Sequence, residues 1–207
     1  MRYHRIPGEA VRRLPIYLRR LLFLAKQGQE SVSSKDLAEL LGVNPSQIRK
    51  DFSYFGGFGI RGVGYKTEKL ITQIKKILRL DVVRKMALVG VGHLGLAILA
   101  YPGFGMYGFE IAAVFDSDSE KVGRKVNNIT IENTSKLQTL RRRKIDLAII
   151  AVPADGAQET ADALVKAGVK GILNFSPCYI TVPKKVKVVS IDIAMELARL
   201  PYYMPAS

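Results

Sequence analysis

The sequence has no tryptophan and a single cysteine, Cys178, among its 207 residues. One cysteine excludes an internal disulfide, which agrees with a reducing compartment. No stretch approaches the roughly 20 consecutive apolar residues that a membrane-spanning helix needs. The first residues also lack the apolar segment of a signal peptide. We therefore expect a cytoplasmic protein with no membrane partner.

Acidic residues are scarce as well, with 18 Asp and Glu against 32 Lys and Arg, a net charge of +14. The excess is uneven, because residues 1–80 hold 16 of the basic residues but only 6 of the acidic ones. A basic module ahead of a nearly neutral one is typical of a domain that binds a polyanion. The alternative is a solvated basic surface without a ligand.

The clearest motif is the segment MALVGVGHLG at residues 86–95. Its apolar start predicts a buried parallel strand, and a GxGxxG turn leads from that strand into a helix. In dinucleotide-binding folds such a turn cradles the pyrophosphate. The alternative is a glycine-rich turn in another α/β domain. The loop residues predicted to bind the cofactor are Gly90, Val91, Gly92, His93, Leu94 and Gly95.

A second strand, residues 109–115, ends in Asp116. This acid stands where a dinucleotide-binding domain hydrogen-bonds the adenosine ribose. Asp116 predicts NAD(H) rather than NADP(H), because a carboxylate repels a 2′-phosphate. Lys121 and Arg124 lie close in sequence and would weaken that repulsion.

The rest of this module alternates strand and helix patterns, which predicts a doubly wound parallel sheet. Strands are expected near residues 128–131, 146–151 and 171–174, with helices at 134–143 and 154–167. Ligands in open α/β sheets bind at the carboxyl ends of the strands. The residues predicted to line the nicotinamide half of the crevice are Val152, Pro153, Asn174, Phe175, Ser176 and Pro177.

The basic module begins and ends with an amphipathic helix. The first is expected between Pro7 and Gly28, with Pro15 kinking or splitting it. The last is expected to begin with Thr67 as its cap. Its apolar face carries Leu70, Ile71, Ile74, Ile77 and Leu78.

Between them lie two short helices. The first begins at Ser33 or the next residue, where Asp36 completes a capping box, and it ends at Gly42. The second runs over residues 45–55, with Asn44 as its N-cap and a proline at its first position. Two short helices joined by a glycine-containing turn are typical of a helix-turn-helix. The alternative is a pair of core helices that bind nothing.

The second of these helices carries hydrogen-bonding side chains near its N-terminal end, which a recognition helix presents to base edges. Ile48 and Phe52 form its buried side. The glycine-rich residues 56–65 predict a β-hairpin, or wing, whose tip would enter the minor groove. The residues predicted to contact DNA are Ser46, Gln47, Arg49, Lys50, Tyr54 and Arg61.

An oxidoreductase is the alternative function. Hydride transfer to a carbonyl needs a proton donor beside the nicotinamide and a domain for the substrate. Of the two histidines, His4 lies at the N-terminus and His93 in the phosphate loop, and the sheet module has no Tyr-x-x-x-Lys pair. The sequence therefore favours a regulator with no catalytic residues and no metal site over an NAD(H)-dependent oxidoreductase with a basic accessory domain.

The last apolar segment, residues 191–200, predicts a helix with Asp192 near its start. Its simplest role is to pack on the sheet. Its apolar breadth also suits exchange into a second subunit, and a dimer is what a palindrome-reading helix-turn-helix requires.

These segments together resemble the Rex family of redox-sensing transcriptional repressors. The resemblance rests on RLPIYLR at residues 13–19, SSKDLAELLGVNPSQIRKDFSYFGGFGIRGVGY at 33–65, GVGHLG at 90–95, YPGF at 101–104, FDSDSEKVG at 115–123, AVPA at 151–154, KGILNFSP at 170–177 and IDIAMELARL at 191–200. His93 and Leu96 depart from residues common in the family, which bears on the cofactor's affinity and not on its class.

The resemblance implies a cytoplasmic homodimer that binds pseudo-palindromic, double-stranded operator DNA when NADH is low and leaves it when NADH binds. It also implies a coupling triad. By motif, a tyrosine near the nicotinamide falls on Tyr101, an aspartate of the partner's swapped helix on Asp192, and an arginine of the first helix on Arg19.

We therefore predict three parts in an α/β protein. Residues 1–80 form a winged helix-turn-helix domain, and residues 81–190 form a Rossmann-type domain that binds NAD(H). Residues 191–207 form a C-terminal helix that is swapped in the dimer.

Overall fold

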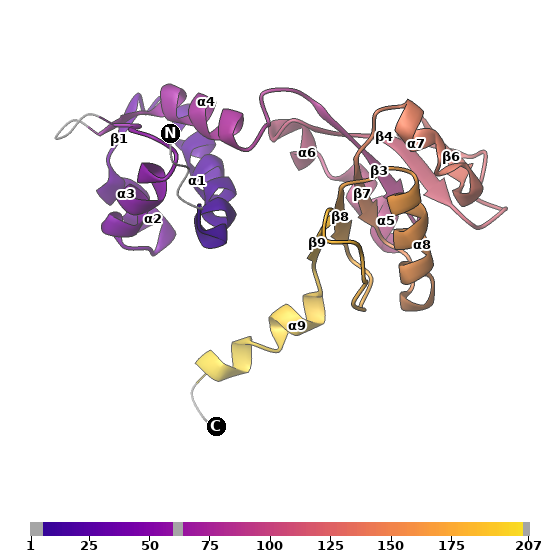
Figure 1. The fold of residues 1–207 in the computed structure, drawn as a ribbon. Coiled ribbons are helices and arrows are strands. Elements are labelled where there is room, and N and C mark those ends of the chain that lie inside the picture. The colour runs from indigo at the N-terminus through magenta and orange to yellow at the C-terminus, as the bar shows by residue number, and fades with distance from the viewer. Residues whose placement is uncertain (1–5, 60–63, 205–207) are drawn as a thin grey trace. The chain divides into compact units, whose positions relative to one another are not determined.

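The computed structural model describes residues 6–59 and 64–204 (Figure 1). The chain divides into two compact units, Met1–Val82 and Val83–Ser207. Each unit has its own apolar core. Within the described residues, no helix is both long enough and apolar enough to cross a membrane.

The first unit contains α1 (Gly8–Lys26), β1 (Ser31–Val32), α2 (Ser34–Leu41), α3 (Pro45–Ser53), β2 (Tyr65–Lys66) and α4 (Thr67–Ile77). Helix α1 packs against α4, and α2 packs against α3. Helix α1 runs unbroken through Pro15, so the expected split is wrong. Pro15 lies on the exposed side, where water can donate a hydrogen bond to the backbone carbonyl that loses its N–H partner. Leu14 and Leu18 are fully buried, and their packing holds the helix together on either side.

The caps around the helix-turn-helix form as the sequence predicts. The Ser33 hydroxyl accepts from the backbone N–H of Asp36 at 3.1 Å, and the Asp36 carboxylate accepts from the N–H of Ser33 at 2.8 Å. Gly42 ends α2 in the left-handed region, with φ 63°. The side chain of Asn44 accepts from the N–H of Ser46 at 2.9 Å and begins α3. These local interactions fix the turn between the two helices.

The segment predicted as the wing pairs at its end with an earlier part of the chain. Tyr65 pairs with Val32 in the antiparallel β1–β2 ladder, and the described residues 56–59 contain no strand. The centre of the hairpin expected within residues 56–65 lies outside the described residues, and the chain that follows it pairs with the segment ahead of α2. The expected cap at Thr67 is wrong. Lys66 occupies the N-cap position, and the Thr67 hydroxyl is buried.

The second unit is built on a seven-stranded sheet with the order β5-β6-β4-β3-β7-β8-β9. Strands β3 (Arg84–Val89), β4 (Phe109–Asp116), β6 (Ile129–Asn133), β7 (Leu147–Ile150), β8 (Gly171–Asn174) and β9 (Lys187–Ser190) are parallel. Strand β5 (Lys125–Val126) is antiparallel to β6. Without β5, this is the strand order of a Rossmann sheet. The predicted α/β fold class is confirmed.

The core of this unit lies on both faces of the sheet. Ala87 and Val89 of β3 join one apolar cluster, and Met86 and Leu88 join the other. The connecting helices are α5 (His93–Ala100), α6 (Gly103–Met106), α7 (Thr139–Arg142) and α8 (Ala154–Lys166). Because alternate residues of a strand point to opposite faces, both faces of the sheet are covered, as a doubly wound fold requires.

Three segments differ from the sequence prediction. The helix expected over residues 134–143 is a 3-10 turn at Thr134–Lys136 followed by the short α7. Strand β9 was not predicted at all. The C-terminal helix is shorter than expected, with α9 at Ile193–Leu197 and a 3-10 turn at Leu200–Tyr203. Pro201 in that turn has no N–H to continue an α-helix.

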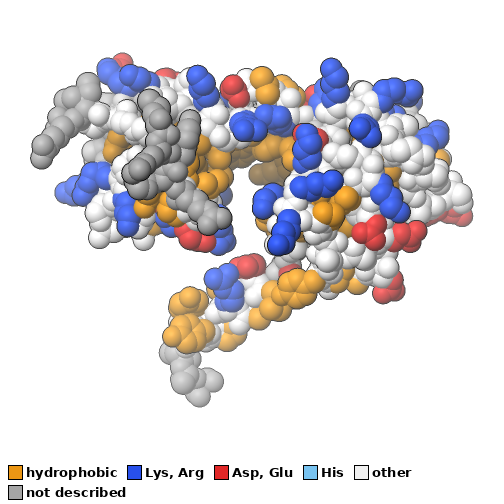
Figure 2. Space-filling view, in the orientation of Figure 1, with side chains coloured by type: hydrophobic (Ala, Val, Ile, Leu, Met, Phe, Trp, Pro, Cys, Tyr) orange, Lys and Arg blue, Asp and Glu red, His pale blue; other side chains and the backbone are white. Residues whose placement is uncertain are grey.

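Helix α9 buries none of its residues. Ile193, Met195 and Leu197 are each about 60% exposed, and Tyr202 is 86% exposed. Figure 2 shows hydrophobic side chains along this C-terminal segment. The segment therefore presents apolar surface to solvent in the single chain.

Candidate cofactor site and nucleic-acid interface

The glycine loop depends on backbone conformations that only glycine adopts easily. Gly90 has φ 97°, and its N–H donates to the carbonyl of Phe115 at 2.8 Å. A Cβ at Gly90 would press on the carbonyl of Ala151, and a Cβ at Gly95 would overlap the carbonyl of Gly90. These two glycines are required by the protein itself, because β3, β7 and α5 meet there.

Gly92 is different. Its φ is −82°, a value any residue adopts, and a Cβ at this position would meet nothing within 4 Å. The first intrahelical bond of α5 is donated by the N–H of Leu96 to the carbonyl of Gly92. The N–H groups of the first turn therefore have no intrahelical acceptor. Open space beside free N–H groups at a helix N-terminus fits a bound phosphate.

Asp116 lies at the carboxyl end of β4 and is only 7% exposed. Its Oδ2 accepts from the backbone N–H of Val91 at 2.7 Å, and its Oδ1 accepts from the N–H of Asp118 at 2.9 Å. Asp116 therefore shapes the glycine loop. The N–H of Val91 is directed at Asp116, so it is not a donor for a phosphate.

Lys121 lies between two carboxylates. Its Nζ is 3.2 Å from Oδ2 of Asp118 and 3.6 Å from Oδ2 of Asp116. Hydrogen bonds from the N–H of Glu120 and from Lys121 lower the pKa of Asp118, and the bond to Asp118 raises the pKa of Lys121. These three charges sum to −1, and the positive charge of Arg124 also acts on Asp118.

A cavity of about 970 Å³ opens along the carboxyl edge of the sheet. It brings together five of the predicted cofactor residues, namely Gly90, Gly92, Asp116, Val152 and Pro153. Val91, His93, Leu94, Gly95 and Tyr101 do not line it, and neither do Asn174 to Pro177. The cavity is large enough for a dinucleotide.

Sequence reasoning missed several residues of the cavity wall. They follow strands β4 and β6 or lie on α8, and the polar ones are Ser117, Asp118, Lys121, Asn133, Thr134, Ser135, Gln138, Asp155, Glu159 and Thr160. The signal that points to the first two groups is their place after a parallel strand, where ligands bind. The wall of α8 has no comparable signal in the sequence.

Asn174 and Ser176 support the loop after β8. Both are buried. The Asn174 amide donates to the carbonyl of Cys178 at 3.0 Å, and the Ser176 hydroxyl donates to the carbonyl of Val152 at 2.6 Å. These contacts hold the loop against the end of β7. They use the amide of Asn174 and the hydroxyl of Ser176 as hydrogen-bond donors within the protein.

The three predicted coupling residues belong to different parts of the chain, and their pairing across two subunits stays a prediction. Tyr101 follows α5, is 56% exposed and contacts Phe104 edge to face, with ring centroids 5.3 Å apart. Asp192 caps α9, because its Oδ1 accepts from the N–H of Ala194 at 3.0 Å. Arg19 is exposed on α1, in the other unit.

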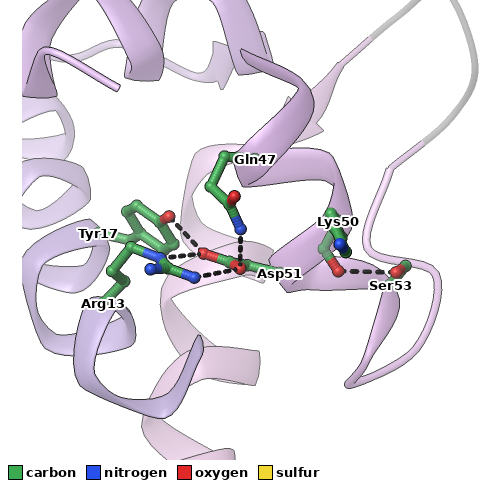
Figure 3. Close-up of polar contacts among 6 residues, drawn as sticks. All are labelled: Arg13, Tyr17, Gln47, Lys50, Asp51 and Ser53. Atoms are coloured by element: carbon green, nitrogen blue, oxygen red, sulfur yellow. Dashed lines mark hydrogen bonds and ion pairs between the residues drawn. The ribbon is translucent and has the colours of Figure 1, made fainter. Parts of the chain in front are cut away.

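Helix α3 carries four of the six predicted DNA contacts, Tyr54 follows it directly, and Arg61 lies outside the described residues. Ser46 and Lys50 are exposed. Arg49 is exposed and donates to the Ser34 hydroxyl at 3.0 Å. Tyr54 follows the helix and is half-buried. Gln47 is half-buried, and its amide bonds to Asp51 (Figure 3).

Asp51 was not predicted as a functional residue. It is fully buried, and Arg13, Tyr17 and Gln47 all donate to its carboxylate. The sequence signal was its position on the face of α3 that also buries Ile48 and Phe52. A charge on an apolar helix face requires partners.

Comparison with known proteins agrees with this division of the chain. A family model described as a putative DNA-binding protein N-terminus matches residues 5–53, and one described as a CoA binding domain matches residues 81–178. A redox-sensing transcriptional repressor Rex of Chloroflexus aurantiacus is 46% identical over 199 residues, covering 96% of this chain and 94% of the relative.

Two solved structures of RSP, a Rex-family repressor, have the same fold. One, in complex with β-NAD⁺ and operator DNA, is 38% identical, with a TM-score of 0.90 over 96% of this chain and 92% of that one. The other, in complex with β-NADH, is 36% identical, with a TM-score of 0.87 over 96% of this chain and 94% of that one.

Proposed function

The chain belongs to the Rex family of redox-sensing transcriptional repressors, and we propose that it represses as a homodimer that leaves a pseudo-palindromic operator when NADH binds. The observation that carries the cofactor half of this proposal is Gly92, whose missing side chain faces open space at the N-terminus of α5. The helix-turn-helix of α2 and α3 supplies the DNA half.

The residues that would hold the dinucleotide follow from the cavity. The first-turn N–H groups of α5 would bind the pyrophosphate. The carboxylate of Asp116 favours a ribose with free hydroxyls, and so NAD(H). Val152 and Pro153 line the cavity where β7 ends. The cofactor distinguishes two redox states by the charge of its nicotinamide ring, so the protein's response requires a difference in affinity for those states.

Dimerisation would involve the C-terminal segment. Its exposed apolar side chains find no partner within the described chain, and a swapped helix would bury them. Two helix-turn-helix units on a two-fold axis would read half-sites about one helical turn apart. Work at an operator also agrees with a cytoplasmic location.

The route from cofactor to DNA would run through Tyr101, Asp192 and Arg19. Arg19 would pair with Asp192 of the partner subunit in the DNA-binding form, and Tyr101 would take over that carboxylate when the reduced ring is bound. The exposure of Arg19 and Tyr101 in the single chain leaves both available for such contacts.

An oxidoreductase is not supported. The matched relatives are named as repressors, and the cavity walls contain carboxylates, amides and hydroxyls but neither histidine of the sequence.

A gel shift on DNA from upstream of NADH-oxidising genes, with and without NADH, tests the proposal. We expect a shifted band that NADH abolishes and NAD⁺ preserves. An NADH-oxidation assay with small carbonyl substrates serves as the control. Turnover in that assay, together with no shifted band, would show that the protein is an enzyme and not a repressor.

A further inference from the structure

The carboxylate of Asp51 is saturated by contacts inside the first unit (Figure 3). Its Oδ2 accepts from Nε of Arg13 and from the hydroxyl of Tyr17, both at 2.6 Å. Its Oδ1 accepts from Nη2 of Arg13 at 2.8 Å and from Nε2 of Gln47 at 2.7 Å. A carboxylate has about four acceptor sites. Asp51 therefore has no capacity left for DNA, although it lies on α3 next to the exposed Lys50.

The contacts keep Asp51 ionised. Burial alone would raise the pKa of Asp51, but the hydrogen bonds from Arg13, Tyr17 and Gln47 outweigh burial and lower it. The two parallel bonds from Arg13 fix the direction of the carboxylate as well as its charge. Because Arg13 and Tyr17 belong to α1, the carboxylate is held from outside its own helix.

Gln47 acquires a single orientation from this arrangement. An ionised carboxylate only accepts hydrogen bonds, so the amide must turn its Nε2 toward Asp51. The other Nε2–H and Oε1 remain for a ligand. One donor and one acceptor on a glutamine amide match the edge of adenine in the major groove. Gln47 lies in the first half of α3, the part of a recognition helix that contacts bases.

We propose that Asp51 is a positioning residue for operator recognition: held by Arg13 and Tyr17, it locks the Gln47 amide so that Gln47 reads one base, an adenine, in each half-site. The inference rests on the proposed binding of operator DNA. Gln47 and Lys50 then have different roles, because the exposed side chain of Lys50 is not held by Asp51.

A merely structural role makes a different prediction. If Asp51 only anchors α3 to α1, its loss weakens binding to all DNA sequences alike. If Asp51 orients Gln47, its loss removes discrimination at the base that Gln47 reads and leaves binding to other sequences nearly unchanged.

The experiment selects binding sites from a random-sequence duplex library with the full-length parent, Gln47→Ala, Asp51→Asn and the double variant. Ser53→Ala is the matched control, because the exposed Ser53 hydroxyl donates to the carbonyl of Lys50 and not to Asp51. Affinities are then measured by fluorescence anisotropy on the site selected by the parent and on a scrambled duplex.

We expect Gln47→Ala and Asp51→Asn to lose the preference for adenine at the same position of each half-site. Each should bind the selected site roughly ten- to one-hundred-fold more weakly, with little change on scrambled DNA. The double variant should be no worse at that position than Gln47→Ala. Ser53→Ala should keep the parent's base profile.

An unchanged base profile for Gln47→Ala overturns the proposal, as does an Asp51→Asn variant that weakens selected and scrambled DNA equally. If Asp51→Asn does not fold, Tyr17→Phe, which removes one donor and keeps the ring, must show the same loss at the same base. A parent protein that selects no site at all refutes the proposed function itself.

Discussion

The N–H of Val91 donates to the carboxylate of Asp116 across 2.7 Å, joining the glycine loop to the end of the neighbouring strand. One side chain thus holds the shape of the glycine loop and, in the proposed function, places a negative charge beside the ribose. We expect that charge to favour NADH over NADPH. Lys121 does not cancel it, because Asp118 shares the same lysine.

We expect the parent to bind NADH more tightly than NADPH by about 1 to 4 kcal/mol, the Coulomb energy of one charge pair near 4 Å at a protein surface. Isothermal titration calorimetry measures both affinities. Asp118→Asn should reduce the difference between the NADH and NADPH affinities, because the charge of Lys121 is then no longer shared with Asp118 and offsets Asp116 more fully. Equal affinities for the two cofactors in the parent would contradict the assignment of Asp116.

Gly92→Ala should weaken NADH binding by about 1 to 3 kcal/mol, the usual cost of an added methyl group in a filled site. The fold should not change, because φ is ordinary and the space is open. Calorimetry gives the affinity and a thermal melt gives the stability. Gly90→Ala should instead lower the melting temperature, because φ at Gly90 is positive and the added Cβ would press on the carbonyl of Ala151. Gly8→Ala, in the other unit, is the control.

Lys50→Ala should reduce operator affinity by about 1 to 3 kcal/mol and reduce the slope of log affinity against log salt by about 0.9 if the ammonium contacts a phosphate. Anisotropy titrations at several salt concentrations measure both. Lys125→Ala removes an exposed lysine from the second unit and should change neither quantity. Identical salt slopes for the parent and Lys50→Ala would place the DNA-binding face elsewhere.

Asp192 must be tested with its capping role in mind, because its Oδ1 accepts from the N–H groups of Ala194 and Met195. Asp192→Ala should still bind NADH but require about 5- to 150-fold more NADH to release operator DNA, the range of ordinary allosteric coupling. Asp192→Ser keeps a capping oxygen without the charge and should respond as weakly as Asp192→Ala. A normal response from Asp192→Ser would mean that the cap, and not the charge, matters.

Acid should remove the contribution of Asp51 to stability. Its folded pKa is lowered, so its stabilisation is complete above the unfolded value of 3.8 and is lost as the pH falls through the folded value. Asp51→Ala should lower the free energy of unfolding by about 3 to 5 kcal/mol near neutral pH, because Arg13 loses its buried partner. Urea unfolding followed by circular dichroism from about pH 7 to about pH 3 should show this difference shrink only at the acid end. If the difference in the free energy of unfolding between the parent and Asp51→Ala did not change with pH, the lost stability would come from packing and not from charge.

Local signals in the sequence predicted much of the fold. Ser33 with Asp36, Gly42 and Asn44 each act within a few residues, so the helix ends they mark can be read directly. The GxGxxG turn and the acid after β4 are also local. Both contribute residues that line the cavity, Gly90 and Gly92 from the turn and Asp116 from the strand end.

Long-range partners could not be predicted in the same way. Tyr65 pairs with Val32 and not with its own neighbours, because the ladder is completed by chain on the far side of the helix-turn-helix. Strand β9 has exposed lysine at its start and joins only the edge of the sheet, so its sequence resembles a loop. The buried role of Asp51 depends on Arg13, which lies on another helix.

The junction of β3 and β7 also bears on how the protein folds. Val89 pairs with Ile150, and the intervening segment contains β4, β5 and β6. Closing such a long segment is slow, because its chain entropy is lost before the pairing is gained. Helices α2 and α3 of the first unit are neighbours in sequence and have caps that act within a few residues, so this pair should form sooner. The cofactor cavity, which requires Gly90 beside Ala151, is then among the last features to appear, so a newly made chain acquires its DNA-binding helices before it can sense NADH.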